Sequence, residues 1–206
     1  MKKIVFMISA VILLLSSCKH KTEEKGECCK KPKTEDSIPA FNSDITLHDI
    51  TSEWTTQDNR KVKLADFKNK AVVAAMIFTN CQSACPRITA DLQRIEAEIP
   101  EENLKDITFL LITMDPARDT PEQLTKFAAE HQLDAKRWTL LTGSKSDVLE
   151  IANVLNVRIS ETKDGNFDHS NIIHIINSKG NIVYQQIGLA QEPTESIEKI
   201  MELTNK

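Results

Sequence analysis

The pattern of apolar and polar positions is clearest near the middle of the chain, where two patterns meet. Residues 71 to 78 are apolar without a break, which fits a strand buried on both faces, although a buried helix produces the same pattern. After Pro86, apolar residues recur at spacings of three and four, at Ile88, Leu92, Ile95 and Ile99. This spacing predicts a helix, and proline suits its first turn because the missing N–H has no helical partner there. The pattern therefore predicts a buried strand that leads directly into an amphipathic helix.

The same two patterns alternate along the rest of the chain from about residue 44. Strands are expected at residues 45–50, 54–58, 59–64, 107–114, 138–142, 170–176 and 181–187. Helices are expected at residues 121–131, 146–155 and 193–203. Thr120 suits the N-cap of the first helix and Ser146 that of the second, and polar turns at 58–59 and 178–180 predict two hairpins. Strands that alternate with helices predict an α/β layer fold.

Composition narrows the function classes only a little. The chain has 206 residues, of which 40% are hydrophobic, enough for one ordinary core and too few to require a second domain. Its formal net charge of −4 argues against a nucleic-acid-binding surface. We find no internal repeat at a fixed period, so a solenoid or propeller is not expected.

The first residues have the composition of a bacterial lipoprotein signal. The chain begins Met-Lys-Lys, residues 4–15 are almost wholly apolar, and Leu-Ser-Ser at 15–17 precedes Cys18. The apolar run is too short for an ordinary membrane span, and the small residues before a cysteine resemble a lipobox. We therefore expect residues 1–17 to be removed and Cys18 to carry the lipid that anchors the protein. The alternative is an ordinary secretory signal that leaves Cys18 unmodified.

The segment after Cys18 differs in composition from the domain that follows it. Residues 18–43 are rich in Lys, Glu and Thr and contain few large apolar side chains, which predicts a flexible tether. Residues 44–206 then form a domain outside the cytoplasm, on the periplasmic side of the cell envelope. Cys28 and Cys29 lie in the tether, either as a transient metal or redox pair or as an incidental exposed pair. We prefer the second interpretation because a disordered segment does not preorganise ligands.

Two further cysteines, Cys81 and Cys85, lie where the buried strand leads into its helix. The N-terminal end of a helix favours negative charge, so we expect a lowered thiol pKa there. A thiolate is both a nucleophile for disulfide chemistry and a soft ligand for Cu(I) or Zn. The spacing is C-x-x-x-C, one residue longer than the usual redox motif. Spacing alone leaves a redox pair and a metal clip equally open, with two inert buried thiols as the third alternative.

Other candidate residues lie at the ends of predicted strands. Active residues on α/β sheets gather beyond the carboxyl ends of the strands, where Asp115 falls together with both cysteines. Asp115 either belongs to a simple turn or orients a ligand near the cysteines. Among the five histidines, His169 follows a glycine-containing loop and is best placed to reach a site. His174 lies within a predicted strand, on the face opposite Ile173 and Ile175, and suits a structural role.

Three motifs of this chain resemble those of the Sco/SenC family. They are FTNC-x-x-x-CP at residues 78–86, MDP-x-RDTP at 114–121 and DHS at 168–170, in the family's order and spacing. The resemblance extends from about residue 45 to residue 203. It implies a thioredoxin-like, three-layer fold with a central mixed sheet flanked by helices and an inserted hairpin.

The resemblance also implies a function. Family members are membrane-tethered copper proteins that help to metallate the dicopper CuA centre of cytochrome c oxidase, and some act as thiol–disulfide reductases toward that site. It implies that Cys81, Cys85 and His169 bind copper, as Cu(I) or Cu(II), and that Asp115 supports the ligands without binding the metal. The expected partners are cytochrome c oxidase subunit II or another copper acceptor, together with a copper donor or a thiol reductant.

Three functions therefore compete. A copper metallochaperone comes first, then a thiol–disulfide oxidoreductase using Cys81 and Cys85, then a peroxidase of the thioredoxin-like superfamily. A redox pair needs no imidazole from a separate segment, so His169 favours the metallochaperone. A peroxidase expects a proline in the loop that residues 79–81 occupy, and none is present. Residues 82–84 read Gln-Ser-Ala, where the family commonly has an acidic residue.

Overall fold

The computed structural model describes residues 45–81, 84–163 and 165–205. The predicted signal peptide, the lipidated Cys18 and the tether with Cys28 and Cys29 lie outside the described residues. Within the described part of the chain, no helix combines the length and apolar character that crossing a membrane requires.

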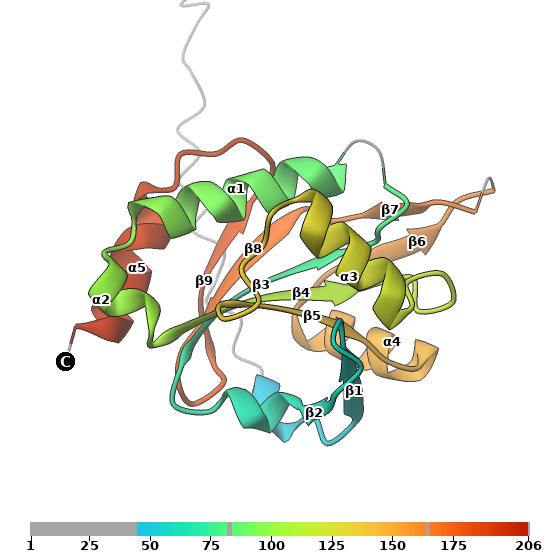
Figure 1. Cartoon of the computed structure of the whole chain (residues 1–206), viewed down its shortest axis with the longest axis horizontal. Helices are drawn as coiled ribbons and strands as arrows, with labels where there is room; N and C mark the ends of the chain where they lie inside the picture. Colours follow the sequence, from blue (N-terminus) through green and yellow to red (C-terminus); the bar gives the residue numbers. More distant parts are fainter. Residues whose placement is uncertain (1–44, 82–83, 164, 206) are drawn as a thin grey trace, which may run out of the picture. The chain divides into compact units, whose positions relative to one another are not determined.

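A mixed seven-stranded sheet forms the centre of the domain, with the strand order β2-β1-β5-β4-β3-β8-β9 (Figure 1). A separate two-stranded sheet contains β6 and β7. The strands are β1 (Glu53–Thr56), β2 (Lys61–Lys63), β3 (Ala71–Ile77), β4 (Ile107–Thr113), β5 (Trp138–Thr142), β6 (Ile159–Glu161), β7 (Phe167–His169), β8 (Ile172–Ile176) and β9 (Ile182–Ile187). The helices are α1 (Ala84–Glu98), α2 (Glu101–Leu104), α3 (Pro121–Glu130), α4 (Lys145–Val154) and α5 (Thr194–Thr204), with 3-10 turns at Leu47–Asp49 and Leu64–Phe67.

Helices cover both faces of the sheet. Helices α1, α3 and α5 lie on one face, and the side-chain amide of Gln93 in α1 donates to the carbonyl of His131 at the end of α3 (2.8 Å) (Figure 1). Helix α4 lies on the other face, where the carbonyl of Leu155 at its end is 2.7 Å from Nε2 of His174. Every residue of β3 and β4 is buried, because both strands are central and covered on both sides. The unbroken apolar runs of these strands are explained by this position.

The predicted α/β class is confirmed, as are the two hairpins and the N-cap Thr120. Two local predictions are wrong. The expected strand at residues 45–50 contains a 3-10 turn, closed by a reciprocal capping box between Thr46 and Asp49. The N-cap of α4 is Ser144, because its hydroxyl accepts from the Asp147 amide while the Asp147 carboxylate accepts from the Ser144 amide. Ser146 therefore lies inside the first turn.

The polar stretch between α4 and β8 is the inserted hairpin that the resemblance implied. Strands β6 and β7 pair in antiparallel register, with Ile159 opposite His169 and Glu161 opposite Phe167. Among the described residues, this pair forms hydrogen-bonded ladders with no strand of the central sheet. His169 lies at the end of β7, after the glycine-containing loop. This hairpin extends beyond the sheet at the end where β3 runs into α1 (Figure 1).

Candidate metal centre

The two cysteines lie at the junction between β3 and α1, as their sequence positions predicted. Cys81 follows the end of β3 by four residues, and Cys85 is the second residue of α1. The Phe78 amide donates to Sγ of Cys85 and the Cys85 amide donates to Sγ of Cys81, both at 3.4 Å. Both side chains carry reduced thiols. The hydrogen bonds bring the two sulfurs to the same short turn.

The environments of the two thiols differ. Cys85 is fully buried, whereas Cys81 is half-buried at the surface of a pocket. Burial raises the pKa of the Cys85 thiol, and the neighbouring sulfur of Cys81 raises it further. The predicted lowering of the thiol pKa is therefore wrong for Cys85, because desolvation outweighs the effect of the helix N-terminus. Without a metal, this side chain holds its proton at neutral pH.

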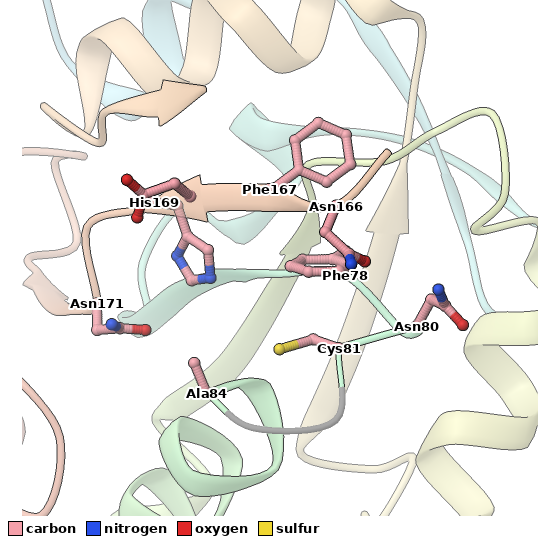
Figure 2. Close-up of a pocket in the computed structure, with 9 residues that line it drawn as sticks. Phe78, Asn80, Cys81, Ala84, Asn166, Phe167, His169 and Asn171 are labelled. Atoms are coloured by element: carbon pink, nitrogen blue, oxygen red, sulfur yellow. The ribbon is translucent and has the colours of Figure 1, made fainter. Parts of the chain in front are cut away.

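An open pocket of about 500 Å³ lies next to the cysteine turn. One side is formed by the turn, the other by β7 and the residues that flank it. The lining residues are Phe78, Asn80, Cys81, Ala84, Asn166, Phe167, Asp168, His169 and Asn171. Figure 2 shows the sulfur of Cys81 and the imidazole of His169 directed into this pocket from opposite sides. The fold therefore brings together two candidate ligands that are far apart in the sequence.

The surroundings of His169 favour the neutral imidazole, which can bind a metal through one ring nitrogen. Its Nδ1 lies 3.2 Å from the carbonyl of Ser170, which suits a proton on Nδ1 and leaves the lone pair on Nε2. Burial lowers the pKa of His169, so the ring is neutral at neutral pH. The ring also packs edge-to-face near Phe78, with the ring centroids 6.0 Å apart. A neutral imidazole with a fixed tautomer is the form that binds metals.

His174 is placed differently. It lies in the central strand β8, is fully buried, and contacts the carbonyl of Leu155 through Nε2. Burial lowers the pKa of His174 to about 4. It does not line the pocket.

Asp115 also lies outside the pocket, although it follows the end of β4 as predicted. Its buried carboxylate forms an ion pair with Arg118. Nη2 of Arg118 then donates to the carbonyl of Gly165 in the β6–β7 loop (2.5 Å), and the guanidinium lies 5.9 Å from the ring centre of Phe167. Asp115 thus connects to the hairpin side of the candidate site through Arg118, and to the cysteine turn through Thr113 and Asp119.

Asp119 is a site-forming residue that the sequence reasoning missed. Its fully buried carboxylate accepts hydrogen bonds from the amide and hydroxyl of Thr79, two residues before Cys81, and from the hydroxyl of Thr113 at the end of β4. Burial raises the pKa of Asp119, although these donors offset part of the effect. The carboxylate fixes the cysteine turn to the neighbouring strand. Its position in the MDP-x-RDTP motif was the available signal, but the motif alone does not distinguish this role from that of a helix cap.

The candidate ligands do not surround a metal-sized point in this geometry. Among the described residues, no group of three or more His, Cys, Asp or Glu side chains is close enough to hold a metal ion as placed. Cys81 and His169 face the same space, and Cys85 adjoins Cys81 through its amide. A shared metal therefore requires at least one of the three side chains to change its position.

Comparisons with known proteins agree on one family. The family model described as SCO1/SenC matches residues 46–205. The SCO1 protein homolog of Bacillus subtilis (strain 168) is 31% identical over 147 residues, which are 70% of this chain and 76% of that protein.

Solved structures are similar as well. A SCO1/SenC family lipoprotein from Bacillus anthracis has a TM-score of 0.68 and 30% identity, covering 73% of this chain and 91% of that one. BsSco, described as having a disulfide switch and as a member of the Sco family of cytochrome c oxidase assembly proteins, has a TM-score of 0.65 and 27% identity, covering 74% and 90%. Arabidopsis thaliana ScoI with copper bound has a TM-score of 0.63 and 20% identity, covering 75% and 96%, and shows likeness of fold alone. These matches confirm the predicted thioredoxin-like fold.

Proposed function

Because the chain belongs to the SCO1/SenC family, we propose that it is a membrane-anchored copper metallochaperone that assists assembly of the CuA centre of cytochrome c oxidase. Sco proteins include members solved with copper bound and members described as cytochrome c oxidase assembly proteins. Copper is the cargo in this proposal, and cytochrome c oxidase subunit II is its acceptor.

One observation carries the proposal: Cys81 and His169 face each other across one pocket, with Cys85 adjoining Cys81. Two thiolates suit Cu(I), which is a soft ion, and an added imidazole also accommodates Cu(II). Asp115 supports this set without joining it. Sulfur and nitrogen ligands argue against the hard cations Mg²⁺ and Ca²⁺, which prefer oxygen donors.

Each residue has a separate task in this proposal. Cys85 releases its proton when copper enters, so copper binding and proton release are coupled. The Nδ1–H of His169 donates to the carbonyl of Ser170, so Nε2 is the nitrogen that binds the metal. Asp119 holds the turn that carries Cys81 through its bonds to Thr79. The open pocket leaves the metal accessible to an acceptor protein.

Anchoring is the second part of the proposal. Residues 1–17 are a lipoprotein signal, Cys18 carries the lipid, and residues 18–43 tether the domain to the periplasmic face of the membrane. The description of the Bacillus anthracis relative as a lipoprotein supports this assignment. In cells that express Cys18→Ala, we expect the precursor to remain unprocessed and to leave the lipid-modified fraction. Normal processing together with unchanged lipid labelling would contradict it.

The copper assignment is tested on the soluble domain of residues 44–206. We expect His169→Ala to keep much of the Cu(I) binding and to lose most stable Cu(II) binding, together with the sulfur-to-copper charge-transfer absorption. His131→Ala is the matched control, because His131 is also half-buried but does not line the pocket. Copper titration, visible absorption and electron spin resonance distinguish the variants. A His169→Ala protein with the wild-type Cu(II) spectrum would contradict the ligand assignment.

A thiol–disulfide oxidoreductase is the second candidate. It is favoured by the short distance between the Cys85 amide and the Cys81 sulfur, and by the disulfide switch described for BsSco. In that reaction the two thiols form a disulfide, and the two electrons and two protons reduce a disulfide of the partner. A wild-type domain that reduces disulfides quickly and binds no copper would establish this function instead.

A further inference from the structure

The β6–β7 hairpin, which carries His169, contacts the domain beneath it through partly buried side chains, among them Ile159 and Phe167. None of the described residues in its two strands is fully buried. Its strands pair with each other and, in the described part of the chain, with no strand of the central sheet. The position of His169 relative to the cysteines therefore depends on contacts that side chains make with the hairpin.

Arg118 makes two of these contacts from a different part of the chain. It lies in the segment between β4 and α3, and its Nη2 donates to the carbonyl of Gly165, 47 residues later in the sequence. The guanidinium also lies over the ring of Phe167 on β7, at 5.9 Å from the ring centre. A planar guanidinium can bond through its edge and pack through its face at the same time, which an ammonium group cannot do.

The other end of this connection is fixed to the central sheet. Nε of Arg118 pairs with the Asp115 carboxylate, whose side chain is only 6% exposed. The Asp115 amide donates to the hydroxyl of Thr113, the last residue of β4 (2.9 Å). The arginine thus bridges the buried end of β4 and the hairpin.

Aromatic contacts connect Phe167, which packs against Arg118, to the imidazole of His169. Phe167 and His169 are two residues apart on β7, so their side chains project from the same face of the strand. Both rings meet Phe78, with centroid distances of 5.3 Å for Phe167 and 6.0 Å for His169. Phe78 follows β3 directly and precedes the cysteine turn. The packing of Phe167 against Phe78 therefore helps to hold β7, and with it His169, beside the pocket that Cys81 lines.

We propose that Arg118 is a positioning residue, which holds the β6–β7 hairpin so that His169 reaches a metal bound by Cys81 and Cys85. This inference rests on the proposed copper function. Two thiolates bind Cu(I) without the imidazole, whereas Cu(II) needs a nitrogen donor. Arg118 consequently sets the preference of the site between the two oxidation states, although it touches neither the metal nor its ligands.

The test compares Arg118→Gln with Arg94→Gln in the soluble domain. Arg94 is a matched control, since it also pairs with an aspartate three residues earlier, and its side chain is 44% exposed against 43% for Arg118. We expect Arg118→Gln to weaken Cu(II) binding about tenfold, as loss of an outer partner of a metal ligand does, and to change Cu(I) binding less than about threefold. Arg94→Gln changes neither. Wild-type Cu(II) affinity in Arg118→Gln would overturn the proposal.

A second readout needs no copper. Hydrogen exchange of the copper-free protein should become faster at the β6–β7 amides of Arg118→Gln and stay unchanged in β3 and β4. Unchanged exchange in the hairpin, or faster exchange throughout the domain, would overturn the positioning role. If the wild-type domain binds no copper, the proposed function fails while the exchange data still decide whether Arg118 holds the hairpin.

Arg118→Lys tests the shape of the contact. Lysine keeps the charge opposite Asp115 but cannot reach the Gly165 carbonyl and cover the Phe167 ring together. We expect Arg118→Lys to match Arg118→Gln within about twofold in Cu(II) affinity. Wild-type behaviour of the lysine variant would contradict a bridge that depends on the guanidinium.

Discussion

The cysteine turn, which continues strand β3 of the central sheet, and the β6–β7 hairpin line the same pocket but are held in different ways. Strand β3, which leads to the cysteines, is buried at every position and pairs with β4 on one side and β8 on the other. The hairpin has no fully buried position among its described strand residues and pairs only within itself in the described structure. The site is therefore divided between a part that follows a fully buried strand and a part that is only partly buried.

This division suits a protein that must bind copper and then release it. Local opening costs least where few apolar contacts are made, so the hairpin opens more readily than the sheet. The two thiols follow β3 of the central sheet, whereas the imidazole lies on β7 of the hairpin. The following predictions test this comparison, beginning with the largest expected effect.

The largest effect is expected from a truncation in the central sheet. Leu111 lies in the middle of β4 and is fully buried. We expect Leu111→Ala to lower the free energy of unfolding by about 2–5 kcal/mol, because it removes buried contacts and leaves a cavity. Urea denaturation followed by circular dichroism measures the loss. A loss below about 1 kcal/mol would show that the sheet is less tightly packed than its burial indicates.

The next effect concerns pH and His174. Its folded pKa is about 4 against an ordinary value of 6.5, so the unfolded chain binds more protons between these values. The resulting stability is present above pH 6.5 and is lost as the pH falls toward 4, about 3 kcal/mol in all.

His174→Gln isolates this contribution, because glutamine cannot titrate but can donate to the Leu155 carbonyl. The difference in unfolding free energy between the wild type and the variant should shrink as the pH falls from 7 to 4. If the difference in unfolding free energy stays constant over this range, groups other than His174 cause the loss of stability at low pH.

A smaller effect is expected from the equivalent truncation in the hairpin. Ile159 opposes His169 in the register and is only half-buried. We expect Ile159→Ala to cost about 1 kcal/mol, since less apolar area is removed from contact. Urea denaturation beside Leu111→Ala gives the direct comparison. Equal losses for the two variants would remove the distinction between the two regions.

The smallest effect on stability is expected from His169 itself. We expect His169→Ala to change the free energy of unfolding by less than about 0.5 kcal/mol, because its ring lies at the edge of an open pocket and its hydrogen bond goes to the carbonyl of the next residue. The same variant should lose Cu(II) binding. Thermal unfolding of the copper-free protein, measured beside the copper titration, separates the two effects. A loss of several kcal/mol would assign the histidine a structural role.

Much of the fold was predictable from local patterns. The unbroken apolar runs identified β3 and β4, because a strand covered on both faces has no polar side. Thr120 followed by proline located the start of α3, since capping is a local interaction. The three motifs identified the family, and with it the thioredoxin-like fold. The cap at Ser146 failed because Ser144 satisfies the same local rule two residues earlier. The strand at 45–50 failed because Thr46 and Asp49 form a capping box that closes a 3-10 turn there.

The tertiary structure alone decided the chemistry of the site. Burial raises the pKa of Cys85, although the Phe78 amide donates to its sulfur, whereas its place at a helix N-terminus had predicted a lowered pKa. The bond from Arg118 to Gly165 spans 47 residues and has no local signature. Local sequence determines helices, strands and caps because the interacting groups are neighbours along the chain. Burial and long-range contacts depend on which distant segments the fold brings together, and these set the pKa values and the placement of His169.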